Sequence, residues 1–174
     1  PGTFRDSAGI VVAKDGTIFI ADAGESQIEV FDAELKYIRS FGSIGIEDNQ
    51  FQRISQIRFD EEEKLYILDS VLCQIKVFNK DGRFIKKWGT KGKKESELDE
   101  PIDFHFLNQN EIIVLERGAY LTGNKNTLKV FTRDGVFKKI FVTDEKYNND
   151  DISYTNIEID SKGNVYLNSY NYDT

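Results

Sequence analysis

Apolar residues along the chain gather in short runs or alternate with polar residues, and a polar turn follows about every 8 to 12 positions. The runs are rich in Ile, Val, Phe and Tyr. No apolar stripe recurs at the three-four spacing of an amphipathic helix. The pattern therefore predicts an all-β protein made of short antiparallel strands.

The same pattern is repeated along the chain. The stretch 17–42 recurs at 64–89, so that Asp22 and Asp69 are equivalent positions 47 residues apart. A third copy opens at Glu111 and carries an insertion of six before its third strand, and a fourth opens at Asn164. A unit of four short strands with a period in the forties is typical of one blade of a β-propeller.

Turn residues delimit the strands within each copy. The expected strands are 9–13, 17–21, 27–32, 36–41, 54–59, 64–68, 73–78, 83–88, 101–107, 111–115, 127–132, 136–142, 155–160 and 164–169. The expected blades are 4–42, 51–89, 98–142 and a half blade at 152–174. The linkers at 43–53, 90–100 and 143–154 carry the chain from an outer strand back to the next inner strand.

The repeat resembles one known family. The segment GIVVAKDGTIFIADAGESQIEVFDAELKYIRSFG at 9–42 is similar to the NHL repeat nearly throughout. The resemblance extends through the second copy, the third with its insertion and half of the fourth. It implies a ring of six blades, of which this chain supplies about three and a half, and it slightly favours an extracytoplasmic location. A four-bladed ring closed by a symmetry mate is the alternative.

One departure from the family pattern recurs in each copy. Where the NHL repeat has Arg before the third strand, this chain has Gln27, Gln74 and Thr127. If that Arg pairs with the Asp that ends the second strand, Asp22 and Asp69 keep at most a neutral hydrogen bond.

Composition narrows the classes of function. A net charge of −7 disfavours a nucleic-acid surface, because phosphate binding needs clustered Lys and Arg. The single Cys73 excludes an intramolecular disulfide framework. No apolar run approaches the length of a membrane span.

The lengthened loop at 116–126 is the first candidate for function. In a propeller, the loop between the second and third strands lies on the same face as the linkers between blades. Binding residues often lie on loops of a rigid scaffold. We therefore expect this linker-bearing face to bind a protein or carbohydrate partner. The expected contacts are Tyr120, Leu121, Arg117, Glu47 and Arg53.

Equivalent positions on the first strands form two rings expected to line the central tunnel. Gln56, Asp103 and Asn156 offer oxygen atoms of the kind that calcium prefers, so they are an alternative metal site. The second ring holds Arg58, His105 and Glu158. We interpret it as a cluster of mutually compensating charges, with a general-base role for His105 as the alternative.

The leading interpretation of function is a non-enzymatic propeller scaffold without a cofactor, which binds its partner through the linker-bearing face. The alternative is a metal-dependent hydrolase, similar to a lactonase, with calcium at the axial ring. Nucleotide-binding loops, nucleophile elbows and Cys-x-x-Cys pairs do not occur in the sequence.

Overall fold

The computed structural model describes residues 5–117, 126–141 and 152–171, in which all regular structure is β-strand. The chain forms two compact units, Pro1–Trp88 and Gly89–Thr174. The first contains β1 (Ser7–Val12), β2 (Ile18–Asp22), β3 (Gln27–Phe31), β4 (Tyr37–Phe41), β5 (Ile54–Phe59), β6 (Leu65–Asp69), β7 (Gln74–Phe78) and β8 (Phe84–Trp88). The second contains β9 (Pro101–Phe106), β10 (Glu111–Glu116), β11 (Thr127–Thr132), β12 (Phe137–Phe141), β13 (Ile152–Ile159) and β14 (Val165–Asn171).

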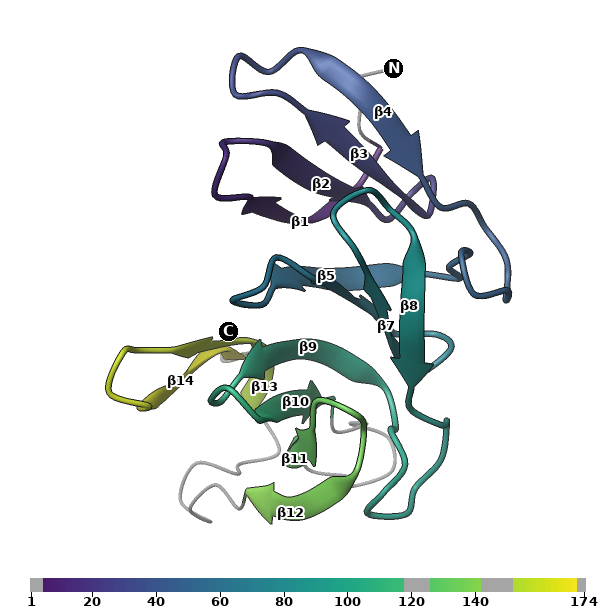
Figure 1. Ribbon diagram of the computed structural model, residues 1–174. Coiled ribbons are helices and arrows are strands. Elements are labelled where there is room, and N and C mark those ends of the chain that lie inside the picture. The colour runs from purple at the N-terminus through teal and green to yellow at the C-terminus, as the bar shows by residue number, and fades with distance from the viewer. Residues whose placement is uncertain (1–4, 118–125, 142–151, 172–174) are drawn as a thin grey trace. The chain divides into compact units, whose positions relative to one another are not determined.

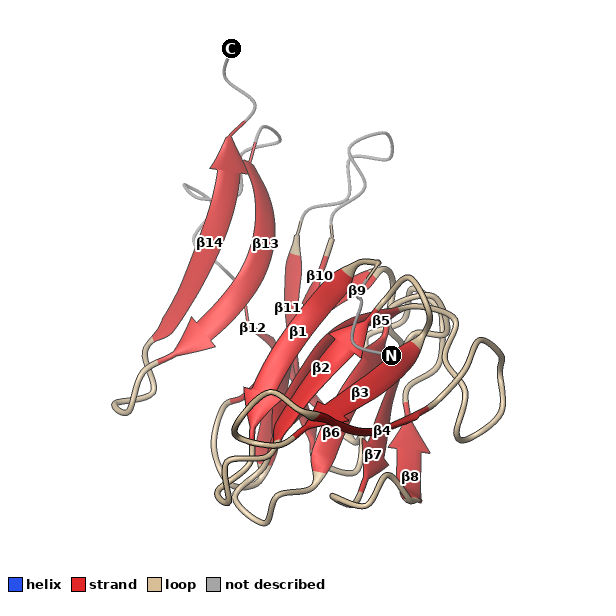
Figure 2. Ribbon diagram, turned by 90° about the horizontal axis from the view of Figure 1, so that it is seen from above, coloured by secondary structure: helices blue, strands red, loops and turns tan. Residues whose placement is uncertain are grey.

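The strands pair as antiparallel meanders, which confirms the predicted fold class. The sheet orders are β1-β2-β3-β4, β5-β6-β7-β8, β9-β10-β11-β12 and the pair β13-β14. Figure 1 shows the meander of each sheet, and Figure 2 shows β13 and β14 as a two-stranded ribbon. The strands predicted at 54–59 and 27–32 are observed at Ile54–Phe59 and Gln27–Phe31.

The two sheets of the first unit pack face to face. Phe19, Ile28 and Val30 of one sheet share a buried cluster with Ile57 and Ile67 of the other. All five side chains are at most 1% exposed. Burial of each large apolar side chain contributes about 1.5–3 kcal/mol, so this cluster accounts for the alternation of apolar residues in the sequence.

In the second unit, β13 lies beside β9, the inner strand of the four-stranded sheet (Figure 1). Ile113, Leu115 and Val130 of that sheet pack against Tyr154 and Ile157 of β13. The pair β13-β14 is therefore attached to its neighbouring sheet through an apolar core of the same kind as the core between the two sheets of the first unit.

The carboxylate that ends each second strand binds the chain entering the blade. Asp22 Oδ2 accepts the backbone N–H of Arg5 at 3.2 Å, and Asp69 Oδ2 accepts that of Gln52 at 2.8 Å. Asp69 Oδ1 also accepts the N–H groups of Arg53, Val71 and Leu72. The hydrogen bonds that Asp22 and Asp69 make are neutral, as expected, but they come from several backbone amides that converge on each carboxylate. A backbone amide needs no particular side chain, so the missing Arg is not required.

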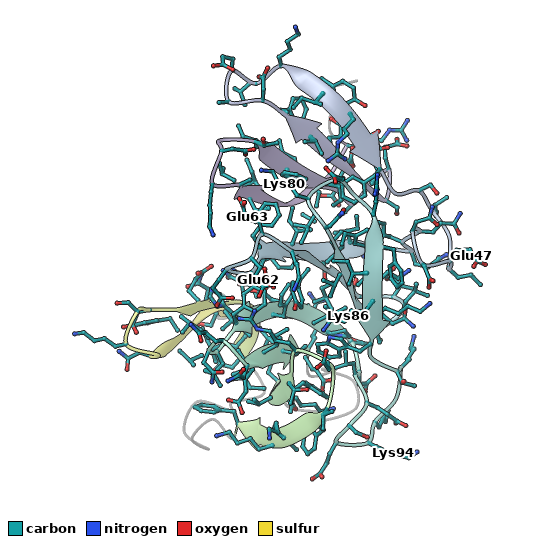
Figure 3. All side chains as sticks on the ribbon, viewed as in Figure 1. Glu47, Glu62, Glu63, Lys80, Lys86 and Lys94 are labelled. Atoms are coloured by element: carbon teal, nitrogen blue, oxygen red, sulfur yellow. The ribbon has the colours of Figure 1, made fainter. Side chains whose placement is uncertain are left out.

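The hairpin ends of the two sheets in the first unit are also joined. Arg39 Nη2 donates to the carbonyl oxygen of Lys80 at 2.7 Å, and Lys80 Nζ lies 2.5 Å from Asp15 Oδ2. The hydrogen bond from Lys80 holds the pKa of Asp15 well below its usual range. In Figure 3, Lys80 lies at the opposite end of this unit from Glu47.

Candidate functional site

The linker at 43–53, here called loop 43–53, has a defined backbone conformation. Ile44 and Phe51 form an isolated parallel bridge. The N–H of Phe51 donates to the carbonyl of Ser43 at 2.8 Å, and the N–H of Gly45 donates to that of Phe51 at 3.0 Å. The turn is closed by the N–H of Gln50, which donates to the carbonyl of Glu47 at 3.1 Å.

The linker at 90–100, here called loop 90–100, has the same backbone hydrogen bonds 47 positions later. The N–H of Leu98 donates to the carbonyl of Thr90 at 2.9 Å, and the N–H of Gly92 donates to that of Leu98 at 3.0 Å. Lys91 and Leu98 form the equivalent parallel bridge. The two loops are therefore two copies of one structural element.

A glycine and a polar side chain hold the interior of each loop. A Cβ atom on Gly45 would collide with the side chain of Gln50, whose Oε1 accepts the N–H of Glu47 at 3.3 Å. In the second copy a Cβ atom on Gly92 would collide with Glu97. Only glycine leaves room for the polar side chain that closes the turn.

An apolar side chain anchors each loop to its unit. Phe51 is fully buried and its ring lies 5.7 Å from that of Phe78. Gly42, just before the loop, has φ of +91°, and an added Cβ atom would lie 2.7 Å from Phe51 Cε2. Leu98, the equivalent of Phe51, is also fully buried.

A buried lysine binds the backbone of each loop. The lysine comes from the third strand of the sheet that follows the loop in the sequence. Lys76 Nζ donates to the carbonyl oxygens of Glu47 and Gln50, at 2.7 and 2.5 Å. Burial lowers the pKa of the Lys76 ammonium. Lys129 Nζ donates to the carbonyls of Lys94 and Glu97, at 3.3 and 2.7 Å.

The Lys129 ammonium has an additional charged partner in its sheet. It pairs with Glu116 Oε2 at 3.0 Å, and both side chains are only 6% exposed. Burial raises the pKa of the Glu116 carboxyl, against the effect of this ion pair.

The outward side chains of the two loops differ, although the backbone is the same. Ile44 is 71% exposed and Ile46 is 65% exposed, whereas the equivalent positions hold Lys91 and Lys93. An exposed lysine is ordinary on a protein surface, whereas Ile44 and Ile46 place two large, exposed apolar side chains close together on one loop. Loop 43–53 therefore presents an apolar surface that folding does not require.

The structure places the predicted partner-binding residues as follows. Glu47 and Arg53 are both exposed on loop 43–53, and Figure 3 shows Glu47 projecting from its tip. The carbonyl of Arg53 accepts the N–H of Ser70 at 3.0 Å. In the second unit, Arg117 is exposed and its N–H donates to the carbonyl of Glu100 at 3.0 Å. Tyr120 and Leu121 lie outside the described residues.

The residues predicted to offer axial oxygen atoms are engaged in backbone and side-chain hydrogen bonds. Asp103 is 1% exposed, and its two carboxylate oxygens accept the N–H groups of Phe104 and Ile157, both at 2.7 Å. Asn156 Oδ1 accepts from Thr155 and from Asn168. In the first unit, Gln56 Oε1 accepts its neighbour's N–H at 2.9 Å. The described part of the chain contains no group of three or more His, Cys, Asp or Glu side chains placed to hold a metal ion.

Two members of the second predicted ring come together in the second unit. His105 Nε2 lies 3.8 Å from Glu158 Oε2, and His105 Nδ1 lies 3.1 Å from the carbonyl oxygen of Phe106. The carbonyl can only accept, so Nδ1 carries the proton of this hydrogen bond. The His side chain is 20% exposed. Arg58 belongs to the first unit and is half-buried there.

Ile44, Ile46 and Lys76 are candidate residues that were not among those predicted from the sequence. The signal for the isoleucines was present, because the offset of 47 aligns them with Lys91 and Lys93. The signal for Lys76 was its apolar strand, in which a charged residue lies between Ile75 and Val77.

Comparison with known sequences decides the family. Residues 46–173 match a family described as 6-bladed beta-propeller. The chain belongs to this 6-bladed beta-propeller family. The predicted propeller fold is thereby confirmed, and the finer resemblance to the NHL repeat stays a prediction. No curated protein sequence matches the chain.

Solved propeller structures share the fold at low sequence identity. Virginiamycin B lyase from Staphylococcus aureus is 14% identical with a TM-score of 0.57, over 92% of this chain and 54% of that one. Hydrazine synthase from Kuenenia stuttgartiensis is 11% identical with a TM-score of 0.66, over 93% and 44%. A chain of a nidogen/laminin complex is 14% identical with a TM-score of 0.65, over 92% and 56%. The chain thus spans about half the length of these structures, and the similarity shows the fold alone.

The described residues include no helix long and apolar enough to cross a membrane.

Proposed function

We propose that this propeller chain is a non-enzymatic scaffold that binds a protein partner through loop 43–53. The observation that carries the proposal is the exposure of Ile44 and Ile46 on a loop whose second copy has lysines at the same positions. Burial of each isoleucine by a partner would contribute about 1.5–3 kcal/mol. The loop is already ordered by its own hydrogen bonds, so binding costs little ordering entropy.

The chemistry of the loop favours a protein over a carbohydrate. Isoleucine side chains have no polar atoms with which to bind sugar hydroxyls, and they fit an apolar protein surface. Glu47 and Arg53 are exposed on the same loop and would belong to the polar rim that surrounds the apolar centre of a protein interface. The nidogen/laminin complex is one propeller neighbour whose name states an assembly of proteins.

The hydrolase alternative has less support. Asp103, the central residue of the proposed metal site, is buried, and both of its carboxylate oxygens accept backbone N–H groups. We therefore expect no cofactor. We also infer that the blades are NHL-like, on the similarity of 9–42 to that repeat.

A substitution at the loop tests the proposal against a matched control. In the double variant Ile44→Lys and Ile46→Lys, loop 43–53 carries the side chains that loop 90–100 already tolerates. The control is Ile38→Lys, because Ile38 is also an exposed isoleucine of the same unit, at 50% exposure, and lies on β4. Affinity capture from an extract of the source cells, with quantitative mass spectrometry, measures the bound partner.

We expect the loop variant to lose the partner and the control to retain it. The thermal unfolding midpoint should be unchanged in both, because exposed substitutions usually alter stability by less than about 0.5 kcal/mol. Equal capture by the loop variant and the unsubstituted protein would contradict the proposal.

A further inference from the structure

The ammonium of Lys76 is buried without being part of the apolar core. The side chain is fully buried, and its Nζ donates to the carbonyls of Glu47 and Gln50. The Phe51 ring centroid lies 5.4 Å from the same nitrogen. Burial of an ammonium is costly unless its donors are satisfied, and two loop carbonyls accept from this one.

The contacts of Lys76 lie at one part of the loop. The two carbonyls that it binds are those of the first and last residues of the turn 47–50, and the carbonyl of Glu47 also accepts the N–H of Gln50. This turn begins directly after Ile46. The direction in which the isoleucines project is therefore set by the segment that Lys76 holds.

The same register position differs between the sheets in a manner that supports a loop-holding role. Lys129 holds loop 90–100 through two equivalent carbonyls. The equivalent residue in the first sheet is Glu29, which is 4% exposed with Oε2 unpaired, and Gln27 Nε2 donates to its Oε1 at 3.4 Å. Carbonyl oxygens accept hydrogen bonds only from a donor, so Lys76 and Lys129 can hold their loops in a way that a carboxylate cannot.

We infer that Lys76 is a positioning residue that fixes the conformation in which loop 43–53 presents Ile44 and Ile46. The partner-binding consequence rests on the function proposed above, whereas the effect on the loop does not. Without the ammonium, the two carbonyls face an apolar environment and the turn opens to reach water. The isoleucines then lose their fixed spacing, and binding must include the entropy of ordering the loop.

Amide hydrogen exchange by NMR tests the effect on the loop. In the Lys76→Met variant we expect the amides of Gly45, Gln50 and Phe51 to exchange at least about tenfold faster, which corresponds to about 1.4 kcal/mol. The matched control is Lys87→Met, since Lys87 pairs with Lys76 across the strands and forms an exposed ion pair with Asp48 of the same loop at 2.8 Å. Loss of that exposed pair should accelerate exchange by less than about threefold.

The amides of Gly92, Glu97 and Leu98 in loop 90–100 serve as an internal reference and should exchange at unchanged rates. If Lys76→Met fails to fold, Lys76→Gln retains a donor for one carbonyl and should give a smaller acceleration in the same three amides. Unchanged exchange in loop 43–53, or equal acceleration at all amides of the folded variant, would overturn the inference.

Partner capture then separates the two claims. Lys76→Met keeps both isoleucines, yet we expect it to weaken capture at least about tenfold while Lys87→Met retains it. If exchange accelerates but capture is unchanged in both Lys76→Met and the double isoleucine variant, the proposed function is wrong and the loop-holding role stands. If the isoleucine variant loses the partner but exchange in Lys76→Met is unchanged, the loop-holding role is wrong and the proposed function stands.

Discussion

Replacement of Asp103 by alanine should detach the inner strand of the half blade from the adjacent sheet. The carboxylate joins β9 to β13 through Oδ2, which accepts the N–H of Ile157, while Oδ1 accepts the N–H of Phe104 within β9, both at 2.7 Å. The side chains of Phe104 and Ile157 are fully buried, so no bulk water is at hand to replace the lost acceptor. The substitution therefore removes a buried hydrogen bond from each of these two backbone donors.

The magnitude follows from these two bonds. A hydrogen bond to a charged group contributes about 1.5–3 kcal/mol, which gives about 3–6 kcal/mol for the pair. Part of this loss is offset because the cost of burying the carboxylate disappears with it. We expect the free energy of unfolding to fall by about 2–4 kcal/mol in Asp103→Ala. Asp103→Asn keeps one acceptor and should lose about half as much.

Equilibrium denaturation by guanidinium chloride measures the change, and hydrogen exchange at the Ile157 amide locates it. Asn156→Ala is the control, because Asn156 is an equivalent residue whose bonds to Thr155 and Asn168 are exposed. Asn156→Ala should lower the free energy of unfolding by less than about 1 kcal/mol. A stable Asp103→Ala variant with a protected Ile157 amide would refute the reasoning. A calcium-dependent rise in the unfolding temperature that Asp103→Ala abolishes would instead support the axial metal site.

Three further predictions concern stability. Gly42→Ala should lower the free energy of unfolding by about 1–3 kcal/mol more than Gly163→Ala does. Both glycines have positive φ, but only a Cβ atom at position 42 would meet a neighbouring atom. Equal losses for the two variants in chemical denaturation would contradict this steric argument. Glu29→Met should raise the free energy of unfolding by about 1–3 kcal/mol, because the substitution removes a buried carboxylate oxygen that has no hydrogen-bond partner. A destabilised Glu29→Met variant would show that Glu29 is paired in solution. Asp15 has a pKa held below its usual range by Lys80, so its contribution is present above about pH 4 and is lost as the pH falls through the lowered value. Asp15→Asn should therefore reduce stability above about pH 4 and match the parent protein in strong acid, and parallel acid-denaturation curves would contradict this assignment.

The strands could be predicted from the sequence because each blade repeats the same alternation at a fixed offset. The offset of 47 aligns Ile54–Phe59 and Gln27–Phe31 with their copies from the sequence alone. Alignment also placed Gln56, Asp103 and Asn156 at equivalent positions. It did not reveal that the Asp103 carboxylate turns toward β13, because the period of the sequence gives a residue's position and not the direction of its side chain.

The loop surface was predictable only in part, because the sequence shows the aligned isoleucines and lysines but not the contact that holds the loop. Lys76 contacts carbonyls of residues 26 and 29 positions away, and a carbonyl oxygen leaves no trace in the sequence. From the sequence alone, loop 43–53 is therefore predicted as a connection between strands and not as an element with a fixed conformation. The difference between Ile44 and Lys91 gains meaning only once both loops are known to share one backbone conformation.

Photo-crosslinking at the loop tests most directly the claim that loop 43–53 is the partner-binding surface. A benzophenone amino acid is placed at position 46 or, as a control, at position 38, and the protein is irradiated in an extract of the source cells. Position 46 should form a crosslink to a protein, and an excess of this chain without the benzophenone should prevent that crosslink. Position 38 should form no crosslink. A competed crosslink from position 38 with none from position 46 would contradict the claim.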